Sequence, residues 1–170
     1  LSSLRIGLGF LSVFFLVFYG MWLVEKLRQA PQTAPTFGAG TAFYLFFNAF
    51  LYVVLGYFRL NFEDYHRFQG LFVLFNIALH LGVSYLLFRR FAQAPPFAFV
   101  SWLAIVLFLL FFPVQFDGLN ITLGWAAALV GLFWIGRSKR LPVYEMGSLL
   151  LLPLLLLRLW VDNTTHYYGY

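Results

Sequence analysis

Polar side chains able to bind a solute or a proton lie inside two apolar stretches of this chain. Asn48 lies in one of them, and in the next the residues at every fourth position are Asn76, His80 and Ser84. Positions four apart share one face of a helix, so these last three side chains point the same way. Amides, imidazoles and hydroxyls can donate and accept hydrogen bonds, as a site for a small polar solute or a proton requires.

A short polar turn, residues 61–67, separates the two stretches and predicts an antiparallel hairpin. Asn48 lies ten residues before Phe58, the last residue of its stretch. Ten residues after Phe68, where the next stretch begins, the chain is midway between Asn76 and His80. At a rise of about 1.5 Å per residue, all three side chains are about 15 Å from the turn, near the bilayer midplane. We therefore predict a ligand-binding site at Asn48, Asn76, His80 and Ser84.

Two other interpretations of these residues stay open. Asn48 could hydrogen-bond with Asn76 or His80 and hold the hairpin together, an interaction worth about 0.6–2 kcal/mol. His80 could instead ligate the metal of a haem or a chlorophyll, although the sequence offers no evident second ligand.

The composition indicates which solvent surrounds these elements. Of 170 residues, 62% are hydrophobic and 10% are charged, and 22% are aromatic. Soluble domains contain about 45–50% apolar and about 25% charged residues. A soluble globule, a disordered tail, a coiled coil and a nucleic-acid-binding domain are therefore disfavoured, despite a net charge of +5. Because the chain has no cysteine, disulfides, thiolate metal ligands and cysteine nucleophiles are excluded.

Six apolar runs are long enough, or nearly so, to cross a bilayer as helices. They predict an all-α polytopic integral membrane bundle of about six transmembrane helices. Helices satisfy their own backbone hydrogen-bonding groups in lipid. Strands of a membrane barrel would alternate apolar and polar residues, whereas these runs are continuously apolar. We expect residues 1–28 to hold the first helix, 29–40 a Pro/Gly/Ala-rich linker, and 41–170 a five-helix bundle with an aromatic tail. The runs are residues 6–24, 41–58, 68–88, 97–112, 121–136 and 142–160.

Basic residues gather in alternate loops and predict the orientation. Seven of the 11 Lys and Arg residues fall in the first, third and fifth loops, and four lie on the other side. Basic loops favour the cytoplasm, so both termini are expected to be extracytoplasmic. The seven are Lys26, Arg28, Arg89, Arg90, Arg137, Lys139 and Arg140.

Several single residues carry local expectations. Pro113 is expected to bend or end the fourth helix, and Pro153 to kink the sixth. Asp117 and Gly118 form a tight turn, after which Asn120 or Thr122 can cap the fifth helix. Two further expectations are a charge pair between Glu145 and Arg137, Lys139 or Arg140, and a contact between Arg158 and Asp162.

The stretch 112–136 resembles a recurring segment of large bacterial multi-pass membrane proteins, a predicted membrane protein family of unknown function. In that family a Pro-x-Gln-x-Asp-Gly helix end precedes a helix that opens Thr-Leu-x-Trp. Residues 44–90 are similar more loosely, and together the two stretches make up about two thirds of the chain. The resemblance implies a bacterial envelope location and a longer parent chain, but no substrate. We expect the chain to be a multi-pass protein of the bacterial inner membrane. The matching residues are Pro113, Gln115, Asp117, Gly118, Thr122, Leu123, Trp125, Trp134 and Gly136.

No catalytic signature accompanies these features. Zincin, nucleophile-elbow and phosphate-loop motifs are absent from the sequence, and Glu63 with His66 supplies at most half of a di-iron site. We expect a non-enzymatic scaffold, accessory subunit or transport-related module. It would need no cofactor or nucleic acid, and its partners would be lipids and other membrane helices or subunits. The alternatives are a membrane-embedded enzyme or permease acting on a lipid or small solute at Asn48, Asn76 and His80, and a pigment- or haem-binding subunit.

Overall fold

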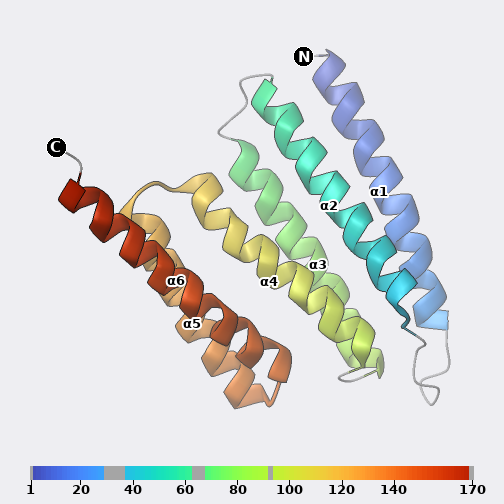
Figure 1. The fold of residues 1–170 in the computed structure, drawn as a ribbon. Helices are drawn as coiled ribbons and strands as arrows, with labels where there is room; N and C mark the ends of the chain where they lie inside the picture. Colours follow the sequence, from blue (N-terminus) through green and yellow to red (C-terminus); the bar gives the residue numbers. More distant parts are fainter. Residues whose placement is uncertain (1, 29–36, 63–67, 92–93, 169–170) are drawn as a thin grey trace. The chain divides into compact units, whose positions relative to one another are not determined.

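The computed structural model describes residues 2–28, 37–62, 68–91 and 94–168. These residues form six α-helices and no strand, so the all-helical prediction is confirmed (Figure 1). Each helix contains a span of 20 to 23 residues that is long and apolar enough to cross a membrane. The helices are α1 (Ser2–Arg28), α2 (Ala39–Phe62), α3 (Gln69–Phe91), α4 (Pro95–Gln115), α5 (Leu119–Lys139) and α6 (Pro142–Tyr168).

The helices extend beyond the apolar runs from which they were predicted. The run 121–136 would give a helix of about 24 Å, but α5 has 21 residues and reaches about 31 Å. Polar residues such as Arg137 and Lys139 continue its last turn. Hydropathy marks the apolar middle of such a helix, whereas the backbone hydrogen bonds continue into its polar ends.

The structure shows how α5 begins and where the two prolines predicted to disturb helices lie. The predicted capping of α5 by Asn120 or Thr122 is wrong, because its N-cap is Gly118, at φ 54°, with no side-chain cap. Backbone bonds to the carbonyls of Asp117 and Gly118 close that turn instead. Pro113 lies in the last turn of α4, two residues before the helix ends, and Pro153 lies within the continuous helix α6.

The chain divides into two compact units, Leu1–Leu107 and Phe108–Tyr170, with the division inside α4. Unit 1 holds α1, α2, α3 and the first part of α4, and unit 2 holds the end of α4 with α5 and α6. The predicted linker at 29–40 lies mostly outside the described residues, and the predicted three-part division stays a prediction.

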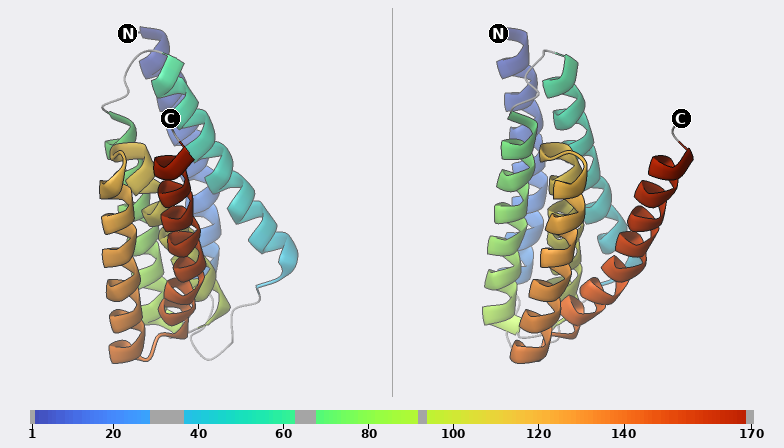
Figure 2. Two further views of the ribbon diagram at one scale, coloured as in Figure 1. Left: turned by 60° about the vertical axis from the view of Figure 1, so that its left-hand side comes forward. Right: turned by 90° about the vertical axis from the view of Figure 1, so that its left-hand side faces the viewer.

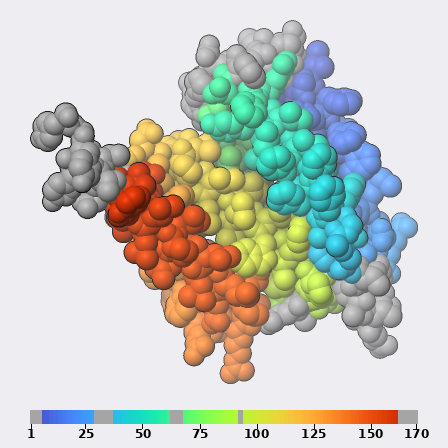
Figure 3. All heavy atoms as spheres, in the orientation of Figure 1, coloured from blue at the N-terminus to red at the C-terminus, as the bar shows by residue number. Residues whose placement is uncertain are grey.

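Unit 1 is built from neighbouring helices that run in opposite directions. Both views in Figure 2 show α2 inclined to α1, so that the two helices diverge towards Arg28 and Ala39. Where α2 and α3 approach, a Cβ on Gly56 would collide with the ring of Phe72. Side chains of α1 and α2 form a continuous face of this unit in Figure 3. Its fully buried core residues include Phe15, Leu45, Leu87 and Val100.

Unit 2 is centred on the α5–α6 hairpin. A Cβ on Gly136 would lie 2.6 Å from the backbone nitrogen of Glu145, so glycine is what lets the two backbones approach. Arg140 ends α5 in the left-handed conformation, at φ 53° and ψ 44°, and the backbone N–H of Leu141 donates to the carbonyl of Gly136 at 2.8 Å. The indole N–H of Trp125 donates to the carbonyl of Leu109 at 2.9 Å, which joins α5 to the end of α4.

Large apolar side chains cover the outward faces of these helices. Phe10 and Trp134 are 70% exposed. Such faces are typical of helices that contact lipid tails, because water would penalise so much exposed apolar area. The exposed residues of α6 include Leu149, Leu150, Leu152, Leu154, Leu156, Leu157 and Leu159.

Replacing Gly136 with alanine should destabilise the hairpin by about 1–3 kcal/mol, because the new methyl group overlaps the α6 backbone. The free energy of unfolding can be measured by titrating the detergent-solubilised protein with sodium dodecyl sulfate. Gly131→Ala is the matched control, since no atom lies within 4 Å of a Cβ there, and its helix should be unchanged or stabilised by up to about 1 kcal/mol. Equal effects of the two substitutions would contradict the close approach at Gly136.

Candidate functional site

Buried polar groups of unit 1 lie near the middle of three of its helices. His80 lies eleven residues from either end of the α3 span Gln69–Phe91. Asn48 lies two residues from the middle of the α2 span Ala39–Asn61, and Tyr19 lies two residues from the middle of the α1 span Ile6–Arg28. His80, Asn48 and Tyr19 therefore lie near the middle of three apolar spans, and Tyr19 was not among the predicted residues.

His80 is held by its own helix. Its side chain is fully buried, and Nδ1 lies 2.8 Å from the backbone carbonyl oxygen of Asn76, one turn earlier. A carbonyl can only accept, so Nδ1 carries the proton and donates it, and Nε2 of the neutral ring is left as an acceptor. That Nε2 is buried and has no hydrogen-bond partner in the structure.

Asn76 is held in the same way. Its Nδ2 donates to the carbonyl of Phe72 at 2.9 Å, while its buried Oδ1 has no partner. Phe72 contacts the ring of Tyr52 on α2, with ring centroids 5.3 Å apart. Asn48 lies one turn before Tyr52 on α2, and Asn76 lies one turn after Phe72 on α3. Because the two helices run antiparallel, Asn48 and Asn76 are at about the same level.

Asn48 is nearly buried and its Nδ2 has no partner. Among the described residues no hydrogen bond joins Asn48 to Asn76 or His80. The expectation that such a bond holds the hairpin together is therefore not met, because both α3 side chains bond to α3 carbonyls instead.

The aromatic face of α1 closes the site. The ring of Tyr19 meets His80 edge-on, with centroids 5.3 Å apart and planes at 63°. Phe15 stacks on Tyr52 at 4.4 Å and 8°. The hydroxyl of Tyr19 is buried without a partner, whereas that of Tyr52 hydrogen-bonds Ser12 at 3.0 Å.

Sequence reasoning missed the contribution of α1. Its buried side chains, Phe15, Tyr19, Trp22 and Lys26, recur at steps of four, three and four residues, which is the spacing of one helix face. That spacing was the available signal, but it was masked by the many other aromatic residues in the same run.

Ser84 belongs to a different contact. Its hydroxyl lies 2.6 Å from that of Ser101, and both side chains are buried. The pair joins α3 to the first part of α4, and Ser101 is a second residue that the sequence analysis did not select. Ser84 therefore supports the site from the next turn of α3.

Asn48, Asn76, His80 and Tyr19, hereafter the midspan cluster, offer donors and acceptors but no charge. Asn48 offers an unused donor, Asn76 and His80 offer unused acceptors, and the Tyr19 hydroxyl can serve as either. Leaving a buried polar atom unpaired costs about 1–3 kcal/mol, so a polar partner for these atoms would recover free energy. The arrangement suits a small uncharged molecule that both donates and accepts hydrogen bonds.

The remaining predicted residues are not members of the midspan cluster. Arg137 contacts Glu145 at 3.9 Å, as expected. Arg158 donates to the Thr122 hydroxyl and to the Gly118 carbonyl, both at 3.2 Å, and the side chain of Asp162 lies outside the described set. The exposed residues are Arg89, Arg90, Pro113, Asp117, Arg137, Lys139, Arg140 and Pro153.

No group of three or more His, Asp or Glu side chains able to hold a metal occurs in the described part of the chain. Glu63 and His66 lie outside it. Comparisons with protein-family models, with curated proteins and with solved structures find no match to this chain.

The hydroxyl pair of Ser84 and Ser101 should appear as a coupling in a double-mutant cycle. Each single alanine substitution should lower the free energy of unfolding, and the double variant should lose less than the sum, with a coupling of about 0.6 kcal/mol. Unfolding in sodium dodecyl sulfate measures it, and Ser138→Ala, on an exposed residue, is the control. Strictly additive losses would show that the two hydroxyls do not interact.

Proposed function

We propose that this chain is a multi-pass protein of the bacterial inner membrane. Its unit 1 would be a transport-related, non-enzymatic module that binds a small uncharged polar solute at the midspan cluster. The observation that carries the proposal is His80, which is fully buried halfway along α3 with Nε2 unpaired. Ionisable side chains at such depth are costly and usually functional.

A membrane setting is supported by the surface of the helices. Their outward faces are dominated by exposed Phe, Leu, Val and Trp side chains, and the described charged residues lie near or beyond the ends of the apolar spans. In the hydrocarbon core of a membrane these apolar faces would not have to be buried against other parts of the protein. Their partners would be membrane lipids and other membrane helices or subunits. The resemblance of residues 112–136 to a bacterial membrane protein family fits the same location and a longer parent chain.

Solute entry would require a change in unit 1. In the described conformation Tyr19 covers His80, and the side chains of Tyr19, Asn76 and His80 are at most 2% exposed. Asn76 and His80 are fixed by carbonyls of α3, so α3 carries half of the site as a rigid face. Separation of α1 from α3 at the Tyr19–His80 contact would open it. Binding near the midplane followed by movement of one helix group against another is how many transporters give alternating access.

The proposed orientation places both termini outside the cytoplasm, and single cysteines can test it in a chain that has none. Ser138→Cys and Asp117→Cys introduce thiols at two exposed positions on opposite proposed sides, the first in the last turn of α5 and the second just after α4. In whole spheroplasts a membrane-impermeant maleimide should label the cysteine at 117. It should label the one at 138 only after permeabilisation, and the reverse pattern would invert the topology.

Solute passage can be measured in proteoliposomes of the full chain by stopped-flow light scattering, with glycerol and urea as probes. The protein should speed the volume change after a glycerol or urea gradient relative to protein-free vesicles. His80→Asn keeps a donor for the Asn76 carbonyl but removes Nε2, so it should slow the protein-dependent flux by about two- to tenfold.

Tyr19→Phe should slow the flux to a similar degree, because it removes the unpaired hydroxyl and keeps the ring. Ser148→Ala, which removes a buried hydroxyl bonded to the Glu145 carbonyl in unit 2, is the matched control and should leave flux unchanged. Transport at the midspan cluster would be refuted if vesicles with the wild-type protein changed volume no faster than protein-free vesicles. It would also be refuted if the variants lost folded protein but kept the wild-type flux per folded molecule.

A further inference from the structure

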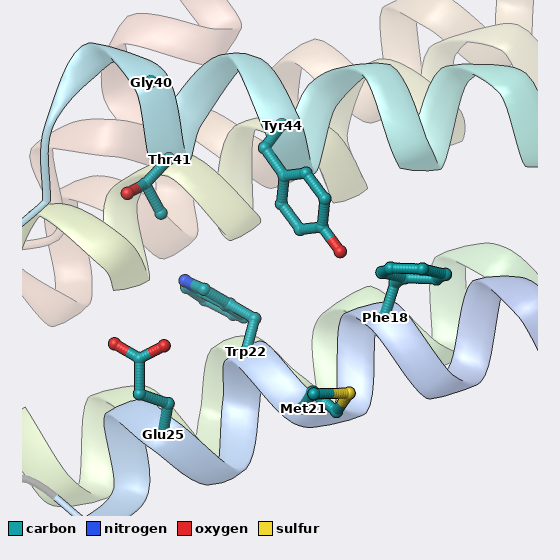
Figure 4. Close-up of a pocket in the computed structure, with 7 residues that line it drawn as sticks. All are labelled: Phe18, Met21, Trp22, Glu25, Gly40, Thr41 and Tyr44. Carbon is teal, nitrogen blue, oxygen red and sulfur yellow. The ribbon is translucent and has the colours of Figure 1, made fainter.

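The divergence of α1 and α2 leaves a groove between the carboxyl end of α1 and the amino end of α2. It encloses about 610 Å³. Phe18 and Met21 of α1 and the ring of Tyr44 of α2 supply its apolar wall, as Figure 4 shows. This wall lies further from the end of α1 than Glu25 does: Met21 is about one turn before Glu25, and Phe18 is about two turns before it.

The end of the groove is polar. Glu25 and Thr41 lie there, and Figure 4 shows the indole nitrogen of Trp22 directed towards them. Trp22 is 6% exposed, and its buried Nε1 has no hydrogen-bond partner. An indole N–H can only donate, so the groove presents an unused donor to an acceptor such as an ester or phosphate oxygen.

A second groove, of about 440 Å³, runs along the other flank of the same helix turns. Met21 and Glu25 line both grooves, and Gly20, Val24 and Arg28 complete the second. Two open grooves, both lined mostly by apolar residues, therefore flank Met21 and Glu25 near the carboxyl end of α1. This is the shape expected for the two acyl chains of one lipid molecule.

The charges at that end have opposite signs. Glu25 is 66% exposed at its side chain, and only Oε1 contacts Lys26, at 3.4 Å. Its carboxylate therefore keeps acceptor capacity for another donor. Arg28, three residues on, is exposed on a neighbouring part of the same helix end. An acid and a base so placed complement a headgroup that carries an ammonium and a phosphate.

From these features we infer that the two grooves bind one phospholipid with a primary-ammonium headgroup, of the phosphatidylethanolamine type. Glu25 accepts from the ammonium, Arg28 donates to the phosphate, and the Trp22 N–H donates to an ester carbonyl. The acyl chains lie along Phe18 and Met21 on one side and Val24 on the other. This site is independent of the midspan cluster and of solute transport.

Native mass spectrometry of the delipidated full chain in detergent tests the site. The protein is mixed with phosphatidylethanolamine, phosphatidylcholine or phosphatidylglycerol of identical acyl chains, and the fraction that retains one lipid is measured. Wild type should retain phosphatidylethanolamine about tenfold better than phosphatidylglycerol, which lacks the ammonium. Phosphatidylcholine, whose nitrogen has no hydrogen to donate, should fall between them.

Glu25→Gln should abolish the preference among the three lipids, and Arg28→Gln should lower retention of all three. Glu145→Gln and Arg137→Gln remove the same two charges from unit 2 and should change nothing. Equal retention of the lipids by wild type, or a preference that survives Glu25→Gln, would overturn the assignment.

A variant that fills the first groove tests whether lipid retention depends on the shape of the groove as well as on the charges of Glu25 and Arg28. Gly40 lines the first groove with open space around a Cβ, so Gly40→Phe should block one acyl chain and reduce retention of every lipid. Gly82→Phe, at an α3 glycine that also has open space, is its control. Thermal unfolding of both variants confirms that they are folded, and undiminished retention by folded Gly40→Phe would place the lipid elsewhere.

Discussion

The contact on which unit 1 depends is the packing of an aromatic face of α1 against α2 and α3. Phe15 lies flat on Tyr52 and Tyr19 meets His80 edge-on, so one helix covers polar positions of two others. Apolar burial contributes little to association between helices that lie in lipid, because lipid tails are as apolar as the side chains. Specific ring geometry therefore has to select the partners, and offset or edge-on ring pairs supply that selectivity.

The polar groups beneath this face are held within a helix rather than between helices. Asn76 and His80 each donate to the carbonyl four residues earlier, which fixes their rotamers without using a neighbouring helix. One polar atom of each stays unpaired as a result. The same two residues are thus rigidly placed, and each keeps one buried polar atom without a partner.

Much of the fold could be predicted from the sequence, because long apolar runs allow few structures in lipid. The positions of Asn48 and His80 near the middle of their helical spans also followed, because the apolar runs of the sequence determine those spans. Which faces meet could not be predicted. Apolar residues cover both the buried and the exposed sides of α1, so Phe15 and Tyr19 look no different from exposed Phe14. The bond between Ser84 and Ser101 depends on a helix pairing that no periodicity encodes.

The α5–α6 hairpin is fastened at both of its ends. Near the turn Gly136 lets the backbones touch, and at the open end Arg158 reaches the start of α5 through Thr122 and Gly118. Arg158 lies three residues from the end of the apolar span of α6, and its bonds to Thr122 and Gly118 form only when α5 is alongside. The two helices of this hairpin consequently stabilise each other, because neither the close backbone approach at Gly136 nor the bonds of Arg158 to Thr122 and Gly118 can form in one helix alone.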